Sequence, residues 1–497
     1  MTFTAGIDAG TQSVKVVVYD DQARRVVAAA SAPLELISGD DGSREQHPGE
    51  WVKAVRACFA NIDPGLRRNI QALAVSGQQH GFVPVGADGE VLAPAKLWCD
   101  TSSSAECVEI MDAVGGAERS IAIAGNPILA GYTASKLPWT RKHRPEVYRR
   151  LARILLPHDY LNFWLTGEAF CEHGDASGTG WLDVRTRQWS PAMLKAIDPQ
   201  RDLTECLPPL VAADSVFRLR ADRAEELGLS PGVLVAVGGG DNMMAAIGTG
   251  CVVPGRLAMS LGTSGTLFAY SDTPVIDPAG GWAAFCSSTG GWLPLICTMN
   301  CTVATETIAK LFGFSTREGD AHIAATAPGA DGLTLLPFLN GERTPDLPLG
   351  KGVLTGLSPH NASPAHFYRA AMEGATFTLK YGYDAFLAAG MSFDRIVLTG
   401  GGAASAAWRQ MVADVFGLTV EVPREAEGAA FGAALQALWS LSQAQGDRTP
   451  LPELVGAHAI SDDALTCTPD AGQVAAYREP YRRFLDHLAA AQRLYAA

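Results

Sequence analysis

The chain has 497 residues, 47% of them hydrophobic and 18% charged, a balance that indicates a globular protein and excludes a disordered chain. At about 150 residues per domain, this length predicts about two to three domains or lobes. The formal net charge is −13, so a global basic field for nucleic acid is excluded, and a phosphate ligand would have to be bound by local groups.

No export or membrane signal is predicted from the sequence. The acidic residue Asp8 comes too early for a signal peptide, and no apolar run reaches the roughly 18 residues of a membrane span. The ten cysteines show neither a CxxC pair nor a zinc-ligand spacing, so we expect reduced thiols. We therefore expect a cytoplasmic protein that binds neither membranes nor nucleic acid.

The first predicted element is a β-hairpin near the start of the chain. An apolar strand ends at Asp8, the turn reads Gly-Thr-Gln-Ser at 10–13, and an apolar strand follows at 14–20. Glycine lets the backbone approach a phosphate closely, and the hydroxyls of Thr11 and Ser13 add donors. A carboxylate beside such a loop suits a Mg²⁺ ion that keeps most of its waters. A tight turn with a solvated Asp8 is the structural alternative.

Strands and helices alternate after this hairpin. We expect strands at 70–75 and 82–85 and helices at 105–114, 145–155 and 221–227. Such alternation is typical of α/β folds.

Two polar clusters follow short strands in this region. Gln79 and His80 come directly after the strand that ends at residue 75, and Trp98 stands two residues before Asp100. An aromatic ring with a carboxylate is a frequent way to hold a sugar, through apolar contact and hydroxyl hydrogen bonds. Taken alone, a single His or Trp is more often a core or surface residue, so these are weak signals.

A glycine run precedes a carboxylate at the end of a further buried strand. The sequence Val-Ala-Val-Gly-Gly-Gly at 235–240 leads to Asp241 and Asn242. Glycines at a strand end leave room for a ligand, and a carboxylate there can accept the proton of an alcohol that attacks a phosphoryl group. The alternative is that Asp241 caps the helix that follows. The GxGxxG spacing of a dinucleotide fold is not convincing here, which argues against a dehydrogenase.

A second hairpin begins past the middle of the chain. Residues 258–270 again read strand, Gly-Thr turn and strand, with Gly262 and Thr263 at the tip. Two such loops facing each other could hold a triphosphate from both sides, and Lys15 of the first hairpin could balance its charge. Neither loop is a Walker A loop, because GxxxxGK[ST] is absent. Turns that simply favour Gly, Thr and Ser are the alternative.

The last third of the chain repeats the α/β pattern. A long helix is expected at 364–387, a buried strand at 395–399, a helix at 405–416, a strand at 418–422, and helices at 428–439 and 472–497. Three glycines at 400–402 stand between the buried strand and the helix from Ser405. Small residues and free helix N–H groups favour a nucleotide site there, and close helix–strand packing is the alternative.

At this point the residues match a known family. The chain resembles the FGGY carbohydrate kinases and, within them, the xylulokinases, along nearly its whole length. The Pro-Phe-Leu-Asn-Gly-Glu-Arg-Thr-Pro run at 337–345 and the Gly-Gly-Gly-Asp-Asn run at 238–242 are especially specific. The matching segments are 6–15, 76–81, 97–107, 155–161, 178–183, 238–242, 260–265, 336–345 and 399–414.

The resemblance implies an α/β fold of two actin-like (ribonuclease H-like) lobes with a catalytic cleft between them. Residues 1–247 would carry the sugar site and the base, and residues 248–497 would bind ATP. It implies that Asp241 accepts the proton of the attacking hydroxyl, and that Asp8 supports Mg²⁺ and ATP as the metal ligand. The substrate-binding residues expected are Gln79, His80, Trp98, Asp100, Asp241 and Asn242. The ATP-binding residues expected are Gly10, Thr11, Gln12, Lys15, Gly262, Thr263, Gly401, Gly402 and Ser405.

Two departures from the family pattern fall in the sugar-facing loops. Gln79 stands where many bacterial xylulokinases have Met before the histidine. Residues 98–102 read Trp-Cys-Asp-Thr-Ser where many have Trp-Asn-Asp, then Gly or Thr, then Arg. These changes bear on the choice of sugar and leave the reaction type unchanged.

The expected reaction is therefore transfer of the γ-phosphoryl group of ATP to a small-molecule sugar, a ketopentose such as D-xylulose. A kinase for another ketose or polyol, such as ribulose, is the nearest alternative. A non-catalytic actin-like sugar sensor is a second alternative, although a sensor would not need Asp241. By analogy with relatives, a homodimer is one alternative for the oligomeric state.

Overall fold

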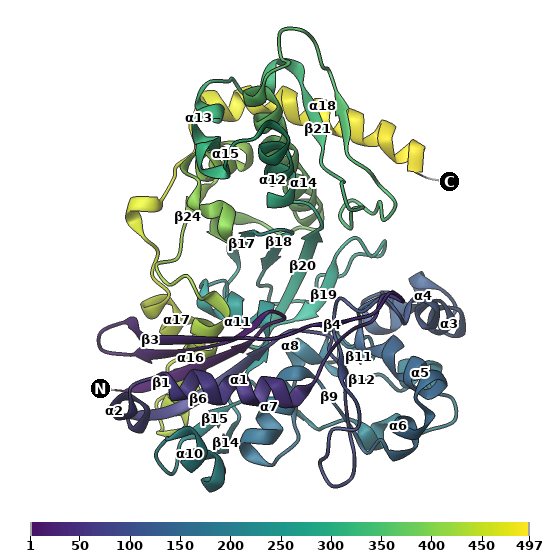
Figure 1. The fold of residues 1–497 in the computed structure, drawn as a ribbon, viewed down its shortest axis with the longest axis vertical. Coiled ribbons are helices and arrows are strands. Elements are labelled where there is room, and N and C mark those ends of the chain that lie inside the picture. Colours follow the sequence, from purple (N-terminus) through teal and green to yellow (C-terminus); the bar gives the residue numbers. More distant parts are fainter. Residues whose placement is uncertain (1, 496–497) are drawn as a thin grey trace. The chain divides into compact units, whose positions relative to one another are not determined.

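The computed structural model describes residues 2–495, which form two compact units (Figure 1). The first unit contains residues 1–252, 271–294 and 427–459, and the second contains 253–270, 295–426 and 460–497. Each unit is therefore made of segments that are far apart in the sequence. The division into functional lobes at 247/248 stays a prediction.

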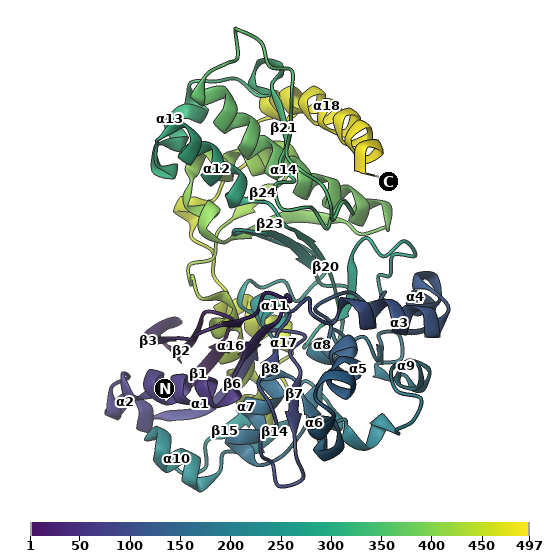
Figure 2. The same cartoon turned by 45° about the vertical axis from the view of Figure 1, so that its right-hand side comes forward.

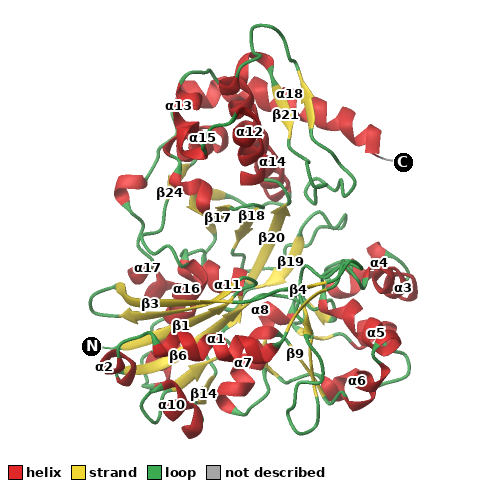
Figure 3. Ribbon diagram, in the orientation of Figure 1, coloured by secondary structure: helices red, strands yellow, loops and turns green. Residues whose placement is uncertain are grey.

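The first unit combines sheets and helices (Figure 3). Its strands are β1 (Phe3–Ala9), β2 (Ser13–Asp20), β3 (Arg25–Pro33), β4 (Ile37–Ser38), β5 (Arg44–Gln46), β6 (Ile70–Gly77), β7 (Val83–Val85), β8 (Ala95–Lys96), β9 (Arg153–Leu155), β10 (Cys171–Glu172), β11 (Leu182–Asp183), β12 (Gln188–Trp189), β13 (Leu210–Val211), β14 (Val216–Arg218), β15 (Leu234–Ala236), β16 (Gly239–Gly240) and β19 (Ala283–Cys286). Its helices are α1 (Pro48–Ala60), α2 (Pro64–Arg68), α3 (Ser104–Val114), α4 (Ala117–Ala124), α5 (Thr133–His143), α6 (Pro145–Arg150), α7 (Pro157–Thr166), α8 (His173–Ala176), α9 (Pro191–Ile197), α10 (Ala221–Leu227), α11 (Asp241–Gly248), α16 (Gly428–Ala444) and α17 (Leu451–His458).

The main sheet of this unit has the order β14-β15-β6-β1-β2-β3, and β16 also pairs with β6. Strands β1 and β2 form the predicted antiparallel hairpin, with Asp8 opposite Lys15. Strand β6 runs parallel to β1 and places Ser76 beside Asp8. Parallel strands end at the same edge of a sheet, so Asp8, the end of β6 and the end of β16 lie together at that edge.

The two faces of β1 pack against different helices. Ala5, Ile7 and Ala9 belong to the hydrophobic core that includes Trp51 of α1 and Leu161 of α7. Because side chains alternate along a strand, the even-numbered residues point to the opposite face. There the hydroxyl of Thr4 donates to the carbonyl of Ala434 in α16, at 2.9 Å. Helix α16 therefore covers the face of the sheet toward which Asp8 points.

Glycines allow α16 to pack unusually close to its neighbours. A Cβ atom at Gly6 would lie 1.8 Å from the carbonyl oxygen of Ala430, and one at Gly432 would lie 1.8 Å from that of Met244 in α11. At Gly248 a Cβ atom would lie 2.0 Å from the carbonyl oxygen of Gly428. These contacts are with backbone atoms, which cannot turn aside as a flexible side chain can. The small-residue helix predicted at 428–439 is therefore present. Its residues are small because the helix packs closely against the backbones of β1 and α11.

One predicted element is wrong in part. A single helix was expected at 145–155, but α6 ends at Arg150 and residues 153–155 form β9. Strand β9 pairs antiparallel with β7, so a tertiary pairing overrides the local helical pattern.

The second unit is built around a sheet in which its own strands follow the order β20-β18-β17-β23-β24. Figure 2 labels β20, β23 and β24 of this sheet. Its strands are β17 (Gly255–Leu261), β18 (Gly265–Ala269), β20 (Trp292–Thr298), β21 (Thr334–Leu336), β22 (Val353–Thr355), β23 (Phe393–Thr399) and β24 (Thr419–Glu421). Its helices are α12 (Thr302–Phe312), α13 (Gly319–Ala324), α14 (Pro364–Ala388), α15 (Ala406–Phe416) and α18 (Ala471–Tyr495). The helix predicted at 472–497 is present up to Tyr495, and residues 496 and 497 lie outside the described residues.

The predicted repeat of the hairpin is confirmed at the level of topology. In the second unit β17 and β18 pair antiparallel, and β17 pairs parallel with β23. In the first unit β1 makes the same two pairings, with β2 and β6. Each unit therefore contains an antiparallel hairpin and a later strand that pairs parallel with the first strand of that hairpin.

All ten cysteines are free thiols. Within residues 2–495, no helix combines the length and the apolar character required to cross a membrane.

Replacing Gly432 with Ala should destabilise the protein by about 2 kcal/mol, because the added methyl group overlaps the backbone of α11. Thermal unfolding measures this change. Gly456→Ala in α17 is the matched control, since a Cβ atom there meets nothing within 4 Å. That control should be neutral or slightly stabilising. Equal melting temperatures for the two variants would contradict the packing argument.

Candidate active site

The first carboxylate of the candidate site is Asp8 at the end of β1. The hydroxyl of Ser76 donates to its Oδ1 at 2.8 Å. Burial raises the pKa of Asp8 to about 6, and the hydrogen bond from Ser76 and the charge of Lys15 oppose this shift. The protein therefore compensates the negative charge of Asp8 only in part. A carboxylate that binds a cation is in this state before the cation binds.

Lys15, expected near a phosphate, forms an ion pair within its own unit. Its Nζ lies 2.6 Å from Oε2 of Glu427, the residue before α16, and both side chains are partly exposed. An exposed pair of this kind contributes only about 0–1 kcal/mol, so it can exchange partners readily. The role of Lys15 toward ATP stays a prediction.

The second carboxylate, Asp241, follows the glycine run at the end of β16. It is the first residue of α11, whose N-cap is Gly240, so Asp241 does not cap the helix. Its Oδ1 accepts from the backbone N–H of Asn242 at 2.8 Å. Burial, with a smaller effect from the negative charge of Asp8, raises the pKa of Asp241 to about 7. A carboxylate with this pKa can hold or release a proton near neutral pH.

The glycine run is held in place from α16. Gly238 has φ +73°, and a Cβ atom there would lie 2.1 Å from the carbonyl oxygen of Val75 in β6. The buried side chain of Gln436 accepts from the N–H of Gly238 at 2.8 Å and donates to its carbonyl at 3.2 Å. Both backbone groups of Gly238 are thus satisfied by one amide, which fixes the strand end that presents Asp241.

Gln79 and Asn242, which were each expected to bind the substrate, are joined by a hydrogen bond. The side-chain amide of Asn242 donates to Oε1 of Gln79 at 2.9 Å. Among the described residues, Nε2 of Gln79 and Oδ1 of Asp175 are buried polar atoms without a hydrogen-bond partner. A Cβ atom at Gly240 would lie 3.1 Å from that oxygen of Asp175 and 3.1 Å from Cδ of Gln79, so both side chains border the same glycine. Unsatisfied buried groups of this kind mark a place where a ligand or water completes the bonding.

His80 is held in an uncommon backbone conformation, with φ +63°. Its Nδ1 lies 2.6 Å from the carbonyl oxygen of Gly178. A carbonyl can only accept, so Nδ1 carries a proton, and in the neutral ring Nε2 then carries the lone pair. The ring stacks on Tyr132 at a centroid distance of 4.8 Å. Sequence reasoning missed Tyr132, because nothing local pairs it with His80.

A buried acidic cluster behind these loops was also missed. Nδ1 of His158 lies 2.6 Å from Oδ2 of Asp175, and Nε2 lies 3.2 Å from Oδ1 of Asp159. Burial raises the pKa of Asp175 well above its usual range and that of Asp159 to about 7. His158 also packs against β6, since a Cβ atom at Gly77 would lie 2.8 Å from its backbone nitrogen. The cluster thus supports the segment that leads to Gln79.

Trp98 lies close to the tip of the first hairpin. Its side chain is 44% exposed, and its Nε1–H donates to the hydroxyl oxygen of Thr11 at 2.9 Å. Thr11 in turn donates to Oε1 of Gln78 at 3.1 Å. An exposed indole face beside polar groups suits a sugar ring or chain. At the same tip, the N–H of Gly10 donates to the carbonyl of Ser13, and Gln12 is exposed.

Asp100, expected to touch the sugar, is fully buried and already bonded. Its oxygens accept from the N–H of Arg44, from Nζ of Lys96 and from both the N–H and the hydroxyl of Ser102. This arrangement fixes the loop that carries Trp98. A direct contact of Asp100 with the substrate stays a prediction.

In the second unit the tip of the second hairpin is tied to the start of α12. The N–H of Thr302 donates to the carbonyl of Gly262, and that of Cys301 donates to the carbonyl of Thr263, both at 2.9 Å. Gly262 donates its own N–H to the carbonyl of Ser264 at 3.1 Å. The tip is therefore a rigid turn, which is a requirement for a phosphate-binding loop.

The glycines at 400–402 divide between packing and open space. Cβ atoms at Gly400 and Gly402 would each lie 2.7 Å from atoms of Leu261 in β17, whereas one at Gly401 meets nothing within 4 Å. The close-packing alternative thus holds for Gly400 and Gly402. Gly401 has open space on its Cβ side, and ATP contacts through the backbone of Gly401 and Gly402 stay a prediction.

Ser405 is engaged within the protein. Its hydroxyl donates to Oδ1 of Asp320 and caps α15 by accepting from the N–H of Trp408. The N–H of Ala406 donates to Oδ2 of Asp320 at 3.0 Å. The helix N–H groups expected for a nucleotide are thus partly occupied by Asp320, and the ATP role of Ser405 stays a prediction.

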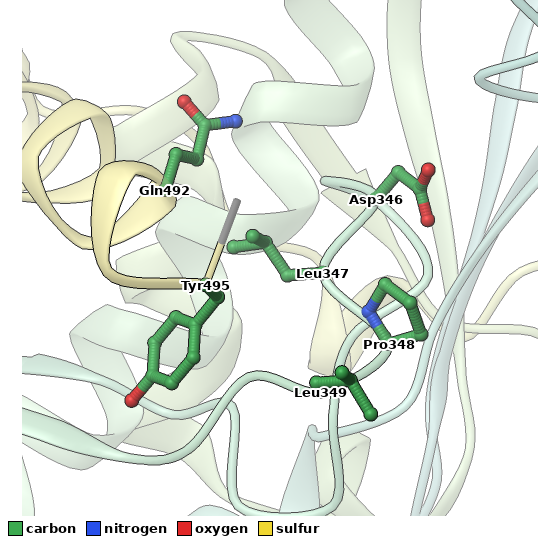
Figure 4. A pocket seen from close by; sticks show the side chains of 6 residues that line it. All are labelled: Asp346, Leu347, Pro348, Leu349, Gln492 and Tyr495. Carbon is green, nitrogen blue, oxygen red and sulfur yellow. The ribbon is translucent and has the colours of Figure 1, made fainter. Parts of the chain in front are cut away.

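A separate pocket of about 250 Å³ lies in the second unit between the loop at 346–349 and α18 (Figure 4). It is lined by Asp346, Leu347, Pro348, Leu349, Gln492 and Tyr495, so it contains none of the predicted site residues. Within the described part of the chain, no group of three or more His, Cys, Asp or Glu side chains is arranged to hold a metal ion.

Comparison with known proteins identifies the family. The N-terminal domain of the FGGY family of carbohydrate kinases matches residues 3–248, and the C-terminal domain of that family matches residues 257–441. The chain belongs to the FGGY family of carbohydrate kinases. The predicted resemblance is confirmed, and the protein is an ATP-dependent sugar kinase.

Individual relatives agree with this assignment. The chain is 41% identical to a xylulose kinase of Haemophilus influenzae, covering 97% of this chain and 99% of the relative. It is 40% identical to a xylulose kinase of Streptomyces coelicolor, covering 87% and 86%. The crystal structure of a xyloylose kinase from Brucella ovis, 32% identical, matches with a TM-score of 0.91 over 99% of this chain and 100% of that one. The predicted α/β fold with actin-like lobes is thereby confirmed.

Replacing Gln436 with Met in this FGGY kinase should lower its stability by about 1–3 kcal/mol, because both backbone groups of Gly238 lose their partner. The midpoint of thermal unfolding measures the loss. Gln443→Met is the control on the same helix, where a partly exposed amide bonds only to the carbonyl of Thr449. A Gln436 variant as stable as this control would show that Gly238 does not depend on α16.

Proposed function

We propose that this kinase transfers the γ-phosphoryl group of ATP to D-xylulose and forms D-xylulose 5-phosphate. The carboxylate of Asp241 carries the proposal, because it stands at a glycine-lined strand end with a pKa of about 7. The relatives that match along most of the chain are named xylulose kinases, which supports the choice of sugar.

Asp241 acts as the general base. As the terminal hydroxyl of the sugar attacks the γ-phosphorus, its proton passes to the Asp241 carboxylate, and ADP leaves with the electron pair of the broken P–O bond. Burial strengthens this base, since it raises the proton affinity of Asp241, and the negative charge of Asp8 adds to this effect before Mg²⁺ is bound. The N–H and side-chain amide of Asn242 hold Oδ1 of Asp241 in a fixed orientation.

The residues present fit a Mg²⁺ ion that is bound mainly through phosphate oxygens and water. Such an ion needs one or two carboxylates from the protein, and Asp8 offers a charge that the protein compensates only in part. Asp8 would hold it, with Asp241 on the same sheet edge. When bound, Mg²⁺ neutralises the charge that develops on the transferring phosphoryl group.

The other residues divide between sugar and nucleotide. The sugar hydroxyls are oriented by Gln79 and Asn242, which are joined by a hydrogen bond, and by His80 through Nε2 of its neutral ring. Trp98 provides an apolar surface. Asp100 supports the Trp98 loop. The proposed ATP contacts are Gly10, Thr11, Gln12 and Lys15 of the first unit and Gly262, Thr263, Gly401, Gly402 and Ser405 of the second. We further propose a cytoplasmic location and a homodimer.

An ADP-release assay with Mg²⁺ and ATP against a panel of ketoses and polyols tests the substrate. D-xylulose should give the highest kcat/KM, with D-ribulose lower, despite the Gln79 and Ser102 departures. A higher kcat/KM for another sugar would reject D-xylulose while leaving the kinase assignment intact.

Replacing Asp241 with Asn should lower kcat by about 10²–10⁴-fold, because the amide cannot accept the hydroxyl proton. The affinities for ATP and sugar should change by less than about threefold, since the residue keeps its shape. Steady-state kinetics and isothermal titration calorimetry separate the two effects. Asp222→Asn, the same change at an exposed carboxylate of α10, is the control and should leave kcat unchanged. Near-normal turnover of the Asp241 variant would remove it from the role of base.

A further inference from the structure

A fully buried lysine lies beneath the loops that carry His80 and Tyr132. Lys136 belongs to α5, and its side chain has no exposed surface. Its Nζ donates to the backbone carbonyl of His80 at 2.5 Å and to that of Gly131 at 2.7 Å. Lysine is almost never fully buried without partners that require it. Lys136 takes no part in the proposed reaction, so its burial needs another explanation.

The first of these carbonyls belongs to a strained residue. His80 adopts a left-handed backbone conformation at φ +63°, which is uncommon for a residue other than glycine and persists only where the surroundings hold it. The hydrogen bonds that hold this residue include one from Lys136 to its carbonyl and one from its Nδ1–H to the carbonyl of Gly178. Without the lysine, the carbonyl of the peptide group between residues 80 and 81 would lose the hydrogen bond that Lys136 donates.

The second carbonyl connects two further loops. Gly131 has φ +96°, and a Cβ atom there would lie 2.2 Å from the carbonyl oxygen of Trp98, so these two segments are in close contact. Gly131 directly precedes Tyr132, whose ring stacks on His80. One nitrogen atom therefore joins the backbones on which His80 and Tyr132 are mounted, and Gly131 extends the contact to the loop of Trp98.

The electrostatic surroundings suit this task at neutral pH. Burial lowers the pKa of Lys136 to about 7, while the charge of Asp100 opposes the shift and that of Lys96 adds to it; Cys99 and Cys107 also face the group. A neutral amine has two N–H bonds, which match the two carbonyl acceptors. The two contacts with His80 and Gly131 can therefore be made in either protonation state.

We propose that Lys136 is a positioning residue for the sugar, which fixes the backbones of His80 and Gly131 and thereby the relative placement of the His80, Tyr132 and Trp98 side chains. The inference rests on the proposed function, in which these side chains receive the sugar. Its consequence is selective: loss of the lysine nitrogen should weaken sugar recognition and leave the handling of ATP unchanged.

Steady-state kinetics of Lys136→Met test the proposal, because Met keeps the length of the apolar stem and removes every donor. We expect the KM for D-xylulose to rise at least about tenfold, while the KM for ATP stays within about twofold and kcat within about fivefold. Lys142→Met on the same helix is the matched control, since Lys142 is partly exposed and pairs with Glu106 and Glu109. It should behave as the wild-type protein does.

Lys136→Gln provides a second variant if the Met variant does not fold. Its amide retains two N–H bonds, so it should recover at least part of the sugar affinity, which a purely structural role would not predict. A wild-type sugar KM in the Met variant would overturn the proposal. So would equal losses in sugar KM, ATP KM and kcat in both variants. A wild-type enzyme that phosphorylates no sugar would overturn the proposed function and this inference together, whereas the other two outcomes leave the function standing.

Discussion

The partial burial of two like-charged carboxylates at one edge of the sheet is the constraint on which the site depends. Asp8 and Asp241 are both held where removal from water raises their pKa values, to about 6 and about 7. An isolated pair of this kind is unfavourable for folding, so the surrounding chain must hold it by packing and hydrogen bonds. The raised pKa of Asp241 suits the proposed base, which must accept a proton at neutral pH. The uncompensated negative charge of Asp8 suits the proposed cation site.

Helix α16 supplies much of that support, although it comes from the last fifth of the sequence. Its glycine contacts let it lie against β1 and α11, and its Gln436 bonds both backbone groups of Gly238. Glu427, just before the helix, pairs with Lys15 beside Asp8. A packing change in α16 should therefore alter the positions of Asp8 and Asp241 without direct contact with either residue.

Local features were predicted from the sequence, and long-range pairings were not. The hairpin that ends at Asp8 and the glycine run before Asp241 are each written in a few adjacent residues, so their motifs could be recognised. The bond between Asn242 and Gln79 and the stack of Tyr132 on His80 join segments that are far apart, and a single sequence contains no signal for such pairs. The expected helix at 145–155 was wrong in part for the same reason, because its end pairs with β7.

The pH dependence of kcat/KM for D-xylulose, measured at saturating Mg²⁺ and ATP, tests the central claim most directly. Asp241 must be ionised to accept the proton, and burial, the largest cause, raises its pKa toward about 7, while Mg²⁺ at Asp8 would cancel the smaller contribution of that charge. Activity should therefore be lost as the pH falls below about 7. We predict a fall of about tenfold per pH unit below that point. A rate that stays constant down to about pH 5, as for an aspartate with the ordinary pKa of about 3.9, would contradict the account.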